Sequence, residues 1–340
     1  MENKPISIAI DPLENGLDEA DIPGDGIEIR QVILGPGQHG IRLDKALAEV
    51  VPEFSRSYLQ QLIEAGHVSV NDRIAGKQSA TVRCNDRMQI NLQPTPQSAA
   101  FKPESMTMDV VYRDADVLVI NKPAGLVVHP APGNWSGTLL NGLLALDGEL
   151  MDVPRAGIVH RLDKDTSGLM VVARRRNAMD ALVAAIAARE VDREYLAIAQ
   201  GHWSRGAVWH SQSPIGRDPR NRLRMAVVDL TRQSGKTAAT DIHLVADSPN
   251  LCLVRCVLHT GRTHQIRVHM AEIGHPLAGD AVYGGRPVAG LAGQALHAFR
   301  LGFAHPITGE RLRFEAAPPD GFLALLASQG LGYNGLSPLN

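Results

Sequence analysis

The spacing of hydrophobic positions predicts two short helices and a small hairpin near the N-terminus. Hydrophobic residues recur at helical spacing over residues 42–51. A second helix is predicted from Ser55, which can cap it, to about Ala65, where Gly66 ends it. Strands are predicted at residues 67–70 and 88–92. This order of elements predicts a compact α/β domain over residues 40–93.

The remainder of the chain is predicted to form a larger domain from about residue 107 to residue 328. Its predicted strands outnumber its helices and show no regular βα alternation, which favours an α+β fold with a mixed, mostly antiparallel sheet flanked by helices and loops. The predicted strands are residues 109–112, 117–121, 126–129, 157–160, 169–173, 193–201, 237–246, 251–259, 296–303 and 311–315. The predicted helices are residues 138–146, 177–189, 263–273 and 322–327.

Three segments lack a clear hydrophobic period and are expected to lie outside these domains. Residues 1–39 are predicted to be an acidic, flexible extension that ends in a short strand at residues 28–34. Residues 94–106, rich in Pro, Ser, Gln and Ala, are predicted to be a linker, and residues 329–340 a C-terminal tail.

The charge distribution changes the picture that the total suggests. The net charge of the 340 residues is −2. Residues 1–39 hold 2 Lys or Arg against 8 Asp or Glu, whereas residues 155–236 hold 15 Lys or Arg against 8 Asp or Glu. A phosphate backbone responds to the local field, so the basic middle of the chain is compatible with a nucleic-acid partner.

The composition also bounds the setting of the protein. Aromatic residues make up 4% of the chain and hydrophobic residues 44%, so aliphatic cores are expected. The chain shows no apolar run of the roughly 20 residues that a membrane span needs, and its N-terminus does not read as a secretory signal. Its 3 cysteines have no disulfide-framework spacing. We therefore expect a cytoplasmic protein without a membrane partner.

A loop dense in charge lies between two hydrophobic runs, at residues 157–159 and 169–173. Residues 161–165 read Arg-Leu-Asp-Lys-Asp, where most turns carry Asn, Gly and Pro. Flanking buried strands would hold an acidic group rigidly at the edge of a cleft. Nearby cations favour the ionised carboxylate, which can be a nucleophile, a base or an electrostatic stabiliser. We expect Asp163 to carry chemistry and Asp165 to shape the turn; a surface ion pair is the structural alternative.

A second polar segment, residues 258–270, runs from a predicted strand through a glycine turn into a predicted helix. His264 and Arg267 are three positions apart and would share a helix face. Arg267 could bind a carboxylate bidentately, and Arg262 with the helix N-terminus could bind a phosphate. We expect Arg262 and His264 to contact the substrate.

A metal site is the alternative interpretation of the same segment. It would use His259, His264 and His269, but their spacing of five differs from the i, i+4 pair of helical zinc sites. Cys252 and Cys256 lie at even spacing in a predicted strand, so both are expected in the core. We expect no metal.

Two further segments have polar residues of interest. Tyr195, near the start of a predicted strand, could stack on a base, although a half-buried core tyrosine is the simpler interpretation. Lys122 and Pro123 lie in a strand–turn–strand segment and are expected to brace the cleft without reacting.

The N-terminal domain resembles the S4 RNA-binding domain. The resemblance covers roughly 50 residues, including RLDKALAEVVPEFSRSYLQQLIEAGHVSVNDRIA. Arg42, Lys45 and Arg56 fall on its polar faces and are expected to contact RNA. A generic small domain with exposed cations is the alternative.

The larger domain, together with this one, resembles the RluA-type pseudouridine synthases over about residues 40–325. The stretches that carry the resemblance are NKPAGLVVHP, DVPRAGIVHRLDKDTSGLMVVA, REYLA, GRTHQIRVHMAEIGHPLAGDAVYGG and LHAFRLGFAHPITGE. By position, the resemblance implies that Asp163 is the catalytic aspartate and that Tyr195 packs against the target base. It also implies that Arg267 pairs with the aspartate and that Arg161 replaces the flipped uridine.

The resemblance implies isomerisation of uridine to pseudouridine in large-subunit (23S) ribosomal RNA. Such a reaction neither oxidises, reduces nor hydrolyses, so no cofactor is expected. We expect a monomer that meets its RNA within a ribosomal precursor or an assembled subunit. Two alternatives stay open: a non-catalytic RNA-binding or assembly factor, and a glycoside or nucleoside hydrolase that uses Asp163.

Overall fold

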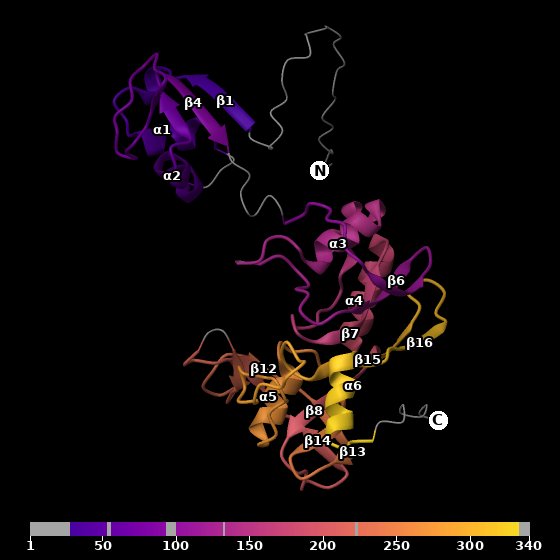
Figure 1. Cartoon of the computed structure of the whole chain (residues 1–340). Helices are drawn as coiled ribbons and strands as arrows, with labels where there is room; N and C mark the ends of the chain where they lie inside the picture. The colour runs from indigo at the N-terminus through magenta and orange to yellow at the C-terminus, as the bar shows by residue number, and fades with distance from the viewer. Residues whose placement is uncertain (1–27, 53–55, 93–99, 132, 222–223, 333–340) are drawn as a thin grey trace. The chain divides into compact units, whose positions relative to one another are not determined.

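The computed structural model describes residues 28–52, 56–92, 100–131, 133–221 and 224–332 (Figure 1). The chain divides into two compact units, residues 1–95 and 96–340. Ser55, residues 94–99 of the predicted linker, residues 1–27 of the predicted acidic extension and residues 333–340 of the predicted tail lie outside the described residues.

The described part of the first unit contains a four-stranded antiparallel sheet, two α-helices and one 3-10 helix. Its strands are β1 (Glu28–Ile33), β2 (Val68–Val70), β3 (Arg73–Ile74) and β4 (Arg87–Leu92), in the order β1-β4-β2-β3. Its helices are η1 (Pro36–Gln38), α1 (Leu43–Val50) and α2 (Arg56–Glu64). The predicted strand at 28–34 is present, and it pairs with β4 from Glu28 to Ile33, so it belongs to this sheet.

The second unit is built on a nine-stranded sheet. Its path is β5-β6-β7-β15-β8-β14-β13-β9, with β16 paired to β15. Among these pairings β7 and β15 are parallel and the others antiparallel, which confirms the predicted mixed, mostly antiparallel sheet. The strands are β5 (Asp109–Arg113), β6 (Val117–Lys122), β7 (Ser167–Ala173), β8 (Asp192–Gln200), β9 (Val208–Ser211), β13 (Thr240–Asp247), β14 (Leu251–Leu258), β15 (Leu296–Ala304) and β16 (Arg311–Glu315).

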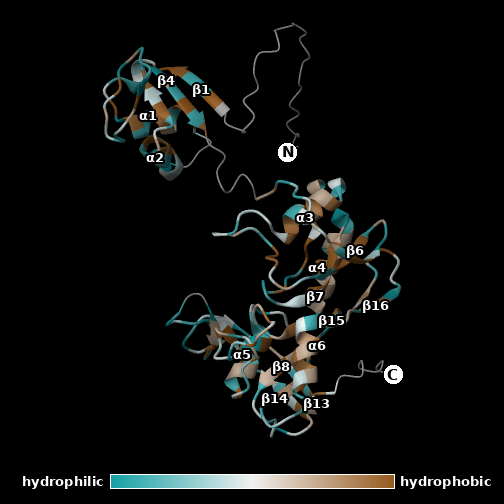
Figure 2. Cartoon of the chain, in the orientation of Figure 1, coloured by the Kyte–Doolittle hydropathy of each residue, from teal (hydrophilic) through white to brown (hydrophobic). Residues whose placement is uncertain are grey.

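Helices cover both faces of this sheet because side chains alternate along each strand. On one face, residues of β6, β7 and β8 pack with α3 (Leu139–Leu146) and α5 (Gln265–Glu272). On the other face, α4 (Arg176–Ala188) and α6 (Asp320–Ser328) complete two further clusters. Figure 2 shows α3 largely brown, in line with its six buried positions. Both Cys252 and Cys256 are buried in the cluster of the first face, as predicted.

Smaller elements complete the unit. A three-stranded sheet of β10 (Ile215–Arg217), β11 (Met225–Val227) and β12 (Gly235–Lys236) was not predicted, because strands of two or three residues carry too few alternating positions to show a period. Two 3-10 helices, η3 (Gly148–Asp152) and η4 (Pro154–Gly157), precede the charged loop.

Two predicted strands are wrong, and the structure shows what replaces them. In the predicted strand 157–160, Gly157 is the last residue of η4 and Ile158 forms an isolated β-bridge with Val172 of β7. The His160 ring accepts a hydrogen bond from the backbone N–H of Val171 at 3.1 Å. Residues 126–129 are buried in part but pair with no strand. Instead the carbonyls of Val127 and Val128 accept the N–H groups of Leu139 and Leu140, which the first turn of α3 leaves free.

Candidate active site

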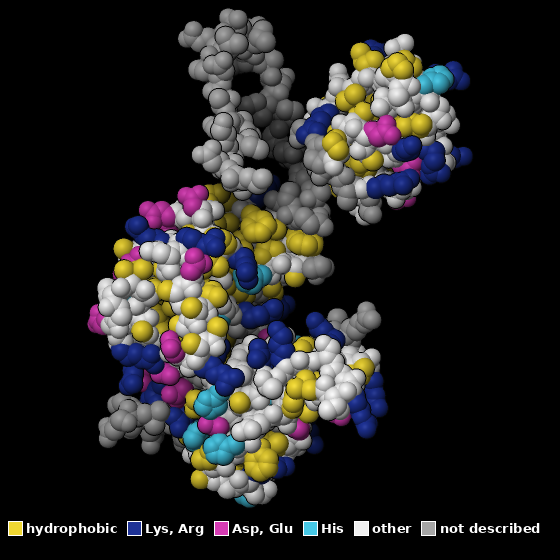
Figure 3. All heavy atoms as spheres, turned by 180° about the vertical axis from the view of Figure 1, so that it is seen from behind, with side chains coloured by type: hydrophobic (Ala, Val, Ile, Leu, Met, Phe, Trp, Pro, Cys, Tyr) yellow, Lys and Arg dark blue, Asp and Glu magenta, His cyan; other side chains and the backbone are white. Residues whose placement is uncertain are grey.

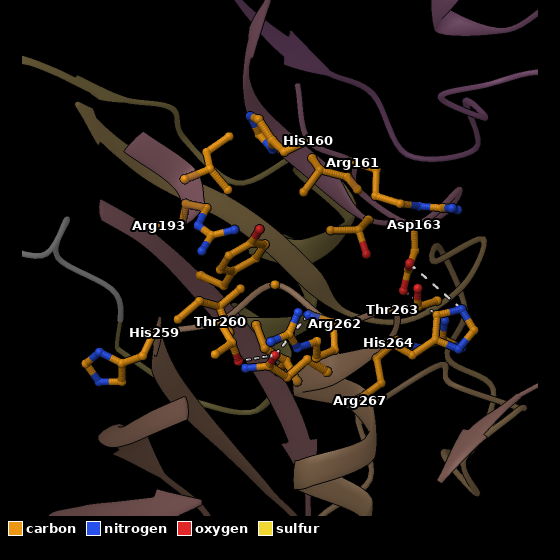
Figure 4. A pocket seen from close by; sticks show the side chains of 18 of the residues that line it. His160, Arg161, Asp163, Arg193, His259, Thr260, Arg262, Thr263, His264 and Arg267 are labelled. Carbon is orange, nitrogen blue, oxygen red and sulfur yellow. Dashed lines mark hydrogen bonds and ion pairs between the residues drawn. The ribbon is translucent and has the colours of Figure 1, made fainter. Parts of the chain in front are cut away.

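A cavity of about 350 Å³ opens in the second unit where three segments meet. They are the charged loop before β7, the start of β8 and the loop between β14 and α5 (Figure 4). Among the described residues that line it, Asp163 is the single acidic one, whereas five are arginines: Arg161, Arg189, Arg193, Arg262 and Arg267. Figure 3 shows Lys and Arg side chains gathered where the surface of this unit is hollowed. The cavity therefore presents one carboxylate within a positive field suited to an anionic polymer.

Asp163 forms an ion pair with Arg267 in the wall of the cavity. Arg267 Nη1 donates to Asp163 Oδ2 at 3.0 Å, which joins the charged loop to α5. The Asp163 side chain is 15% exposed and that of Arg267 6%. The carboxylate is thus oriented by a buried cation while one side of it faces the cavity.

Arg267 is itself fixed by a second carboxylate that the sequence interpretation did not single out. Its Nε and Nη2 atoms donate to the two oxygens of buried Asp280 at 2.7 and 2.9 Å. The guanidinium also lies 4.9 Å from the centre of the Tyr283 ring. Burial by itself lowers the pKa of Arg267, but the hydrogen bonds and charges of Asp280 and Asp163 outweigh it and raise the pKa, so Arg267 stays charged. The stretch GHPLAGDAVYGG contains both residues, but a lone Asp and Tyr in a predicted loop carry no spacing that reveals this contact.

His264 lies beside the same carboxylate, but not on the helix that was predicted to carry it. The helix begins at Gln265, and His264 precedes it with a left-handed φ of 58°. Its Nε2 lies 3.8 Å from Asp163 Oδ1, and its Nδ1 lies 2.8 Å from Tyr283 Oη. Burial lowers the pKa of His264.

Lys122 anchors the charged loop through hydrogen bonds to backbone carbonyls. The Lys122 Nζ atom donates to the carbonyls of Pro123, Leu126 and Lys164 at 2.8 to 2.9 Å, so it ties the turn after β6 to the residue next to Asp163. Burial lowers the pKa of Lys122 to about 8. Lys122 therefore braces the loop as predicted, and its lack of a part in the reaction stays a prediction. Asp165 accepts no hydrogen bond from the turn it was expected to shape.

Tyr195 and Arg161 lie at opposite extremes of exposure. Tyr195, on β8, is 7% exposed and lines the cavity, and burial raises its pKa to about 12. Arg161 lines the cavity with an exposed side chain, and no hydrogen bond joins its guanidinium to another described residue. Arg262 lies in the loop before α5 and donates from Nε to the Thr237 carbonyl at 3.0 Å. The structure therefore brings all six predicted residues of this domain to one cavity.

The histidines of the alternative metal site do not converge. His259 Nε2 lies 2.8 Å from Asp241, and His269 bonds the Thr240 hydroxyl and the Ser213 carbonyl at 3.0 Å. In the described part of the chain, the cluster with metal-ligating spacing is instead Asp114, Asp116 and His305. There Asp114 already accepts from His305 and from two backbone N–H groups.

The cations of the first unit have unequal surroundings. Arg42 and Arg56 donate to the buried carboxylate of Asp44 at 3.0 and 2.8 Å, although both arginine side chains are more than half exposed. These contacts hold the pKa of Asp44 well below its usual value. Lys45 is exposed, and no ion pair joins it to the described residues. Of the three predicted RNA contacts, two therefore also stabilise the unit.

The chain matches two protein families in the places that the fold suggests. Residues 116–272 match the family described as RNA pseudouridylate synthase, and residues 41–87 match the S4 domain. Ribosomal large subunit pseudouridine synthase D of Neisseria meningitidis is 48% identical over 85% of this chain and 78% of its own. The protein of the same description from Escherichia coli is 44% identical over 85% of this chain and 90% of its own.

A solved structure agrees with these matches. Human RNA Pseudouridylate Synthase Domain Containing 1 is 29% identical, covers 66% of this chain and 89% of its own, and superposes with a TM-score of 0.52. The chain therefore belongs to the RNA pseudouridylate synthase family, and the predicted enzyme class is confirmed. Within the described residues, no helix is both long and apolar enough to cross a bilayer.

Proposed function

We propose that this enzyme isomerises specific uridines of large-subunit ribosomal RNA to pseudouridine, with Asp163 acting at the ribose. One observation carries the proposal: the single carboxylate of an arginine-lined cavity is oriented by Arg267 and left open on one side. The substrate class follows the relatives, which are named for the large ribosomal subunit.

The chemistry requires a carboxylate at the anomeric carbon. Breaking the N1–C1′ bond builds positive charge on the ribose, and an ionised Asp163 stabilises that charge, as carboxylates do in retaining glycosidases. The same group can bond to C1′ or remove the 2′ proton, and both routes need the orientation that Arg267 provides. The cation of Arg267 also favours the ionised form of Asp163.

Tyr195 and Arg161 fit the handling of the base. A uridine must leave its stack to reach Asp163, at a cost of a few kcal/mol. Tyr195 offers a buried ring that covers the base face and keeps water out. Arg161, two residues before Asp163 and without a hydrogen bond from its guanidinium to the described residues, can fill the vacated position in the RNA. His264 and Arg262 contact the substrate from the loop before α5.

The first unit supplies an additional RNA-binding surface through Lys45, Arg42 and Arg56. The enzyme acts as a monomer, without a metal, on ribosomal RNA in a precursor or subunit in the cytoplasm. The domain limits we propose are 28–93 for the first domain, because β1 pairs with β4, and 107–328 for the catalytic domain.

The test is product analysis after incubation of the purified protein with large-subunit ribosomal RNA. Digestion to nucleosides should show pseudouridine with the wild type and none with Asp163→Asn. Asp165→Asn is the matched control, because its carboxylate lies two residues away, makes no hydrogen bond to the described residues and does not line the cavity. Unchanged uridine with the wild type would indicate an RNA-binding factor, and abasic ribose with free uracil would indicate a hydrolase. Either result would refute the proposal.

A further inference from the structure

We propose that Arg193 is a further catalytic residue, which binds a carbonyl oxygen of the target uracil and stabilises the negative charge that the base acquires during isomerisation. The inference rests on the proposed function and adds a role for the base that Asp163, Tyr195 and Arg267 do not supply.

Arg193 is a buried cation without a partner in the described chain. It is 7% exposed, its Nε atom is buried with no hydrogen bond, and no ion pair joins it to a described carboxylate. Burying an unpaired charge is costly, so such a group is expected to find its counter-charge in a ligand. Since Arg193 lines the cavity of Asp163, that ligand is the substrate.

The backbone beside Arg193 leaves room for its guanidinium. A Cβ atom added at Gly261 would lie 2.6 Å from Arg193 Nη1. Gly261 does not have the left-handed φ that would itself require glycine. The glycine therefore accommodates the arginine head at the floor of the cavity, in the loop that leads to α5.

The position of Arg193 relative to Asp163 fits the base rather than the ribose. Figure 4 shows Arg193 and Asp163 on opposite sides of the pocket. Tyr195 lies two residues after Arg193 on the same face of β8. The charge of Arg193 lowers the pKa of the Tyr195 hydroxyl and that of Asp163 raises it. A base covered by Tyr195, with its sugar at Asp163, directs an edge toward Arg193. Arg189, which also lines the cavity, is exposed and is better placed for a phosphate.

The reaction gives a buried cation a defined task. The N1–C1′ bond breaks with its electron pair left on the uracil, whose charge spreads over the ring and its carbonyl oxygens. C5 then donates an electron pair to C1′, the C5 proton leaves and N1 takes up a proton, so atoms and electrons balance without a co-reactant. Arg193 stabilises the anion between these two bond changes.

The symmetry of uracil allows one donor to serve both halves of the reaction. Turning the ring about the line through N3 and C6 exchanges N1 with C5 and O2 with O4. A guanidinium that binds one carbonyl before the turn meets the other carbonyl at the same place afterwards. Arg193 therefore holds the detached base without blocking its rotation.

The test measures single-turnover rates with enzyme saturating over RNA, together with the Kd for the same RNA, for Arg193→Met, Arg193→Lys and Gly261→Ala. Arg193→Met should lower the saturated rate about 100-fold or more, as removal of one oxyanion donor does, and raise Kd by less than about threefold. Arg193→Lys should recover part of the rate. Gly261→Ala, which displaces the guanidinium and keeps its charge, should also lower the rate. Arg313→Met, at an exposed site on β16 outside the cavity, is the matched control.

Each outcome decides the proposal. A saturated rate within threefold of the wild type for Arg193→Met would overturn it. Weaker binding with an unchanged rate and a salt slope lower by about one would assign Arg193 to a phosphate and overturn it as well. Tryptophan fluorescence reports whether Arg193→Met folds. If it does not, the saturated rate of Gly261→Ala decides the proposal: a lower rate supports it, and a rate within threefold of the wild type overturns it. Absence of pseudouridine with the wild type would instead refute the proposed function.

Discussion

Asp163 and Asp280 share one guanidinium, and the structure predicts that removing them has opposite consequences for stability and catalysis. Asp280 is 1% exposed and receives two hydrogen bonds from Arg267, at 2.7 and 2.9 Å. Asp163 is 15% exposed and receives one hydrogen bond at 3.0 Å. Asp280 is therefore the main counter-ion of Arg267, and Asp163 is the carboxylate held ready for substrate.

The magnitudes follow from these contacts. Hydrogen bonds to charged groups contribute about 1.5–3 kcal/mol each, and removing one partner of a buried ion pair costs about 3–5 kcal/mol. Asp280→Asn should therefore lower the free energy of unfolding by about 3–5 kcal/mol. Asp163→Asn leaves Arg267 neutralised by Asp280 and relieves repulsion between the carboxylates, so it should cost less than about 1 kcal/mol.

The assay is urea unfolding of the full chain followed by tryptophan fluorescence. The 3 tryptophans, Trp135, Trp203 and Trp209, all belong to the second unit, so the signal reports the domain that holds the cluster. Asp163→Asn should unfold near the wild-type midpoint yet make no pseudouridine, whereas Asp280→Asn should unfold much earlier. Equal losses for the two variants, or a larger loss for Asp163→Asn, would show that the division of roles is wrong.

Three further predictions concern acid stability and the first unit. Burial lowers the pKa of His160 to about 3, so below pH 6.5 the unfolded chain takes up a proton that the folded chain does not. Stability should therefore fall by about 2 kcal/mol between pH 7 and pH 5, and His160→Gln should abolish that part of the fall in urea titrations at the two pH values. Lys45→Ala should weaken RNA binding and lower its salt slope by about one while stability stays unchanged. Arg42→Ala should also lower stability, because buried Asp44 loses a hydrogen-bonding partner, and hydrogen exchange in the first unit should quicken. Identical stability for the last two variants would contradict the role of Arg42.

Local pattern was a good guide wherever an element carries its own period or cap. The predicted helix at 138–146 is present because Thr138 caps it and its hydrophobic positions are buried. The strand at 311–315 has the bounds that its alternation predicts. The strands at 126–129 and 157–160 are absent because a hydrophobic run shows only that a segment is buried. Whether its backbone groups bond a strand, a helix end or the ring of His160 depends on neighbours remote in the chain.

The sequence by itself determined which residues gather chemistry. A charged loop between hydrophobic runs and a segment rich in Arg and His pointed to Asp163 and Arg267, and the resemblance to the pseudouridine synthases pointed to Tyr195. Only the tertiary structure decided how these residues are held. Asp280 became the counter-ion of Arg267, and Arg193 became a buried charge without a partner in the described chain. The physical reason is that burial and ion pairing depend on which segments meet in space, and residues 104 positions apart, such as Asp163 and Arg267, have no spacing in the sequence that encodes their contact.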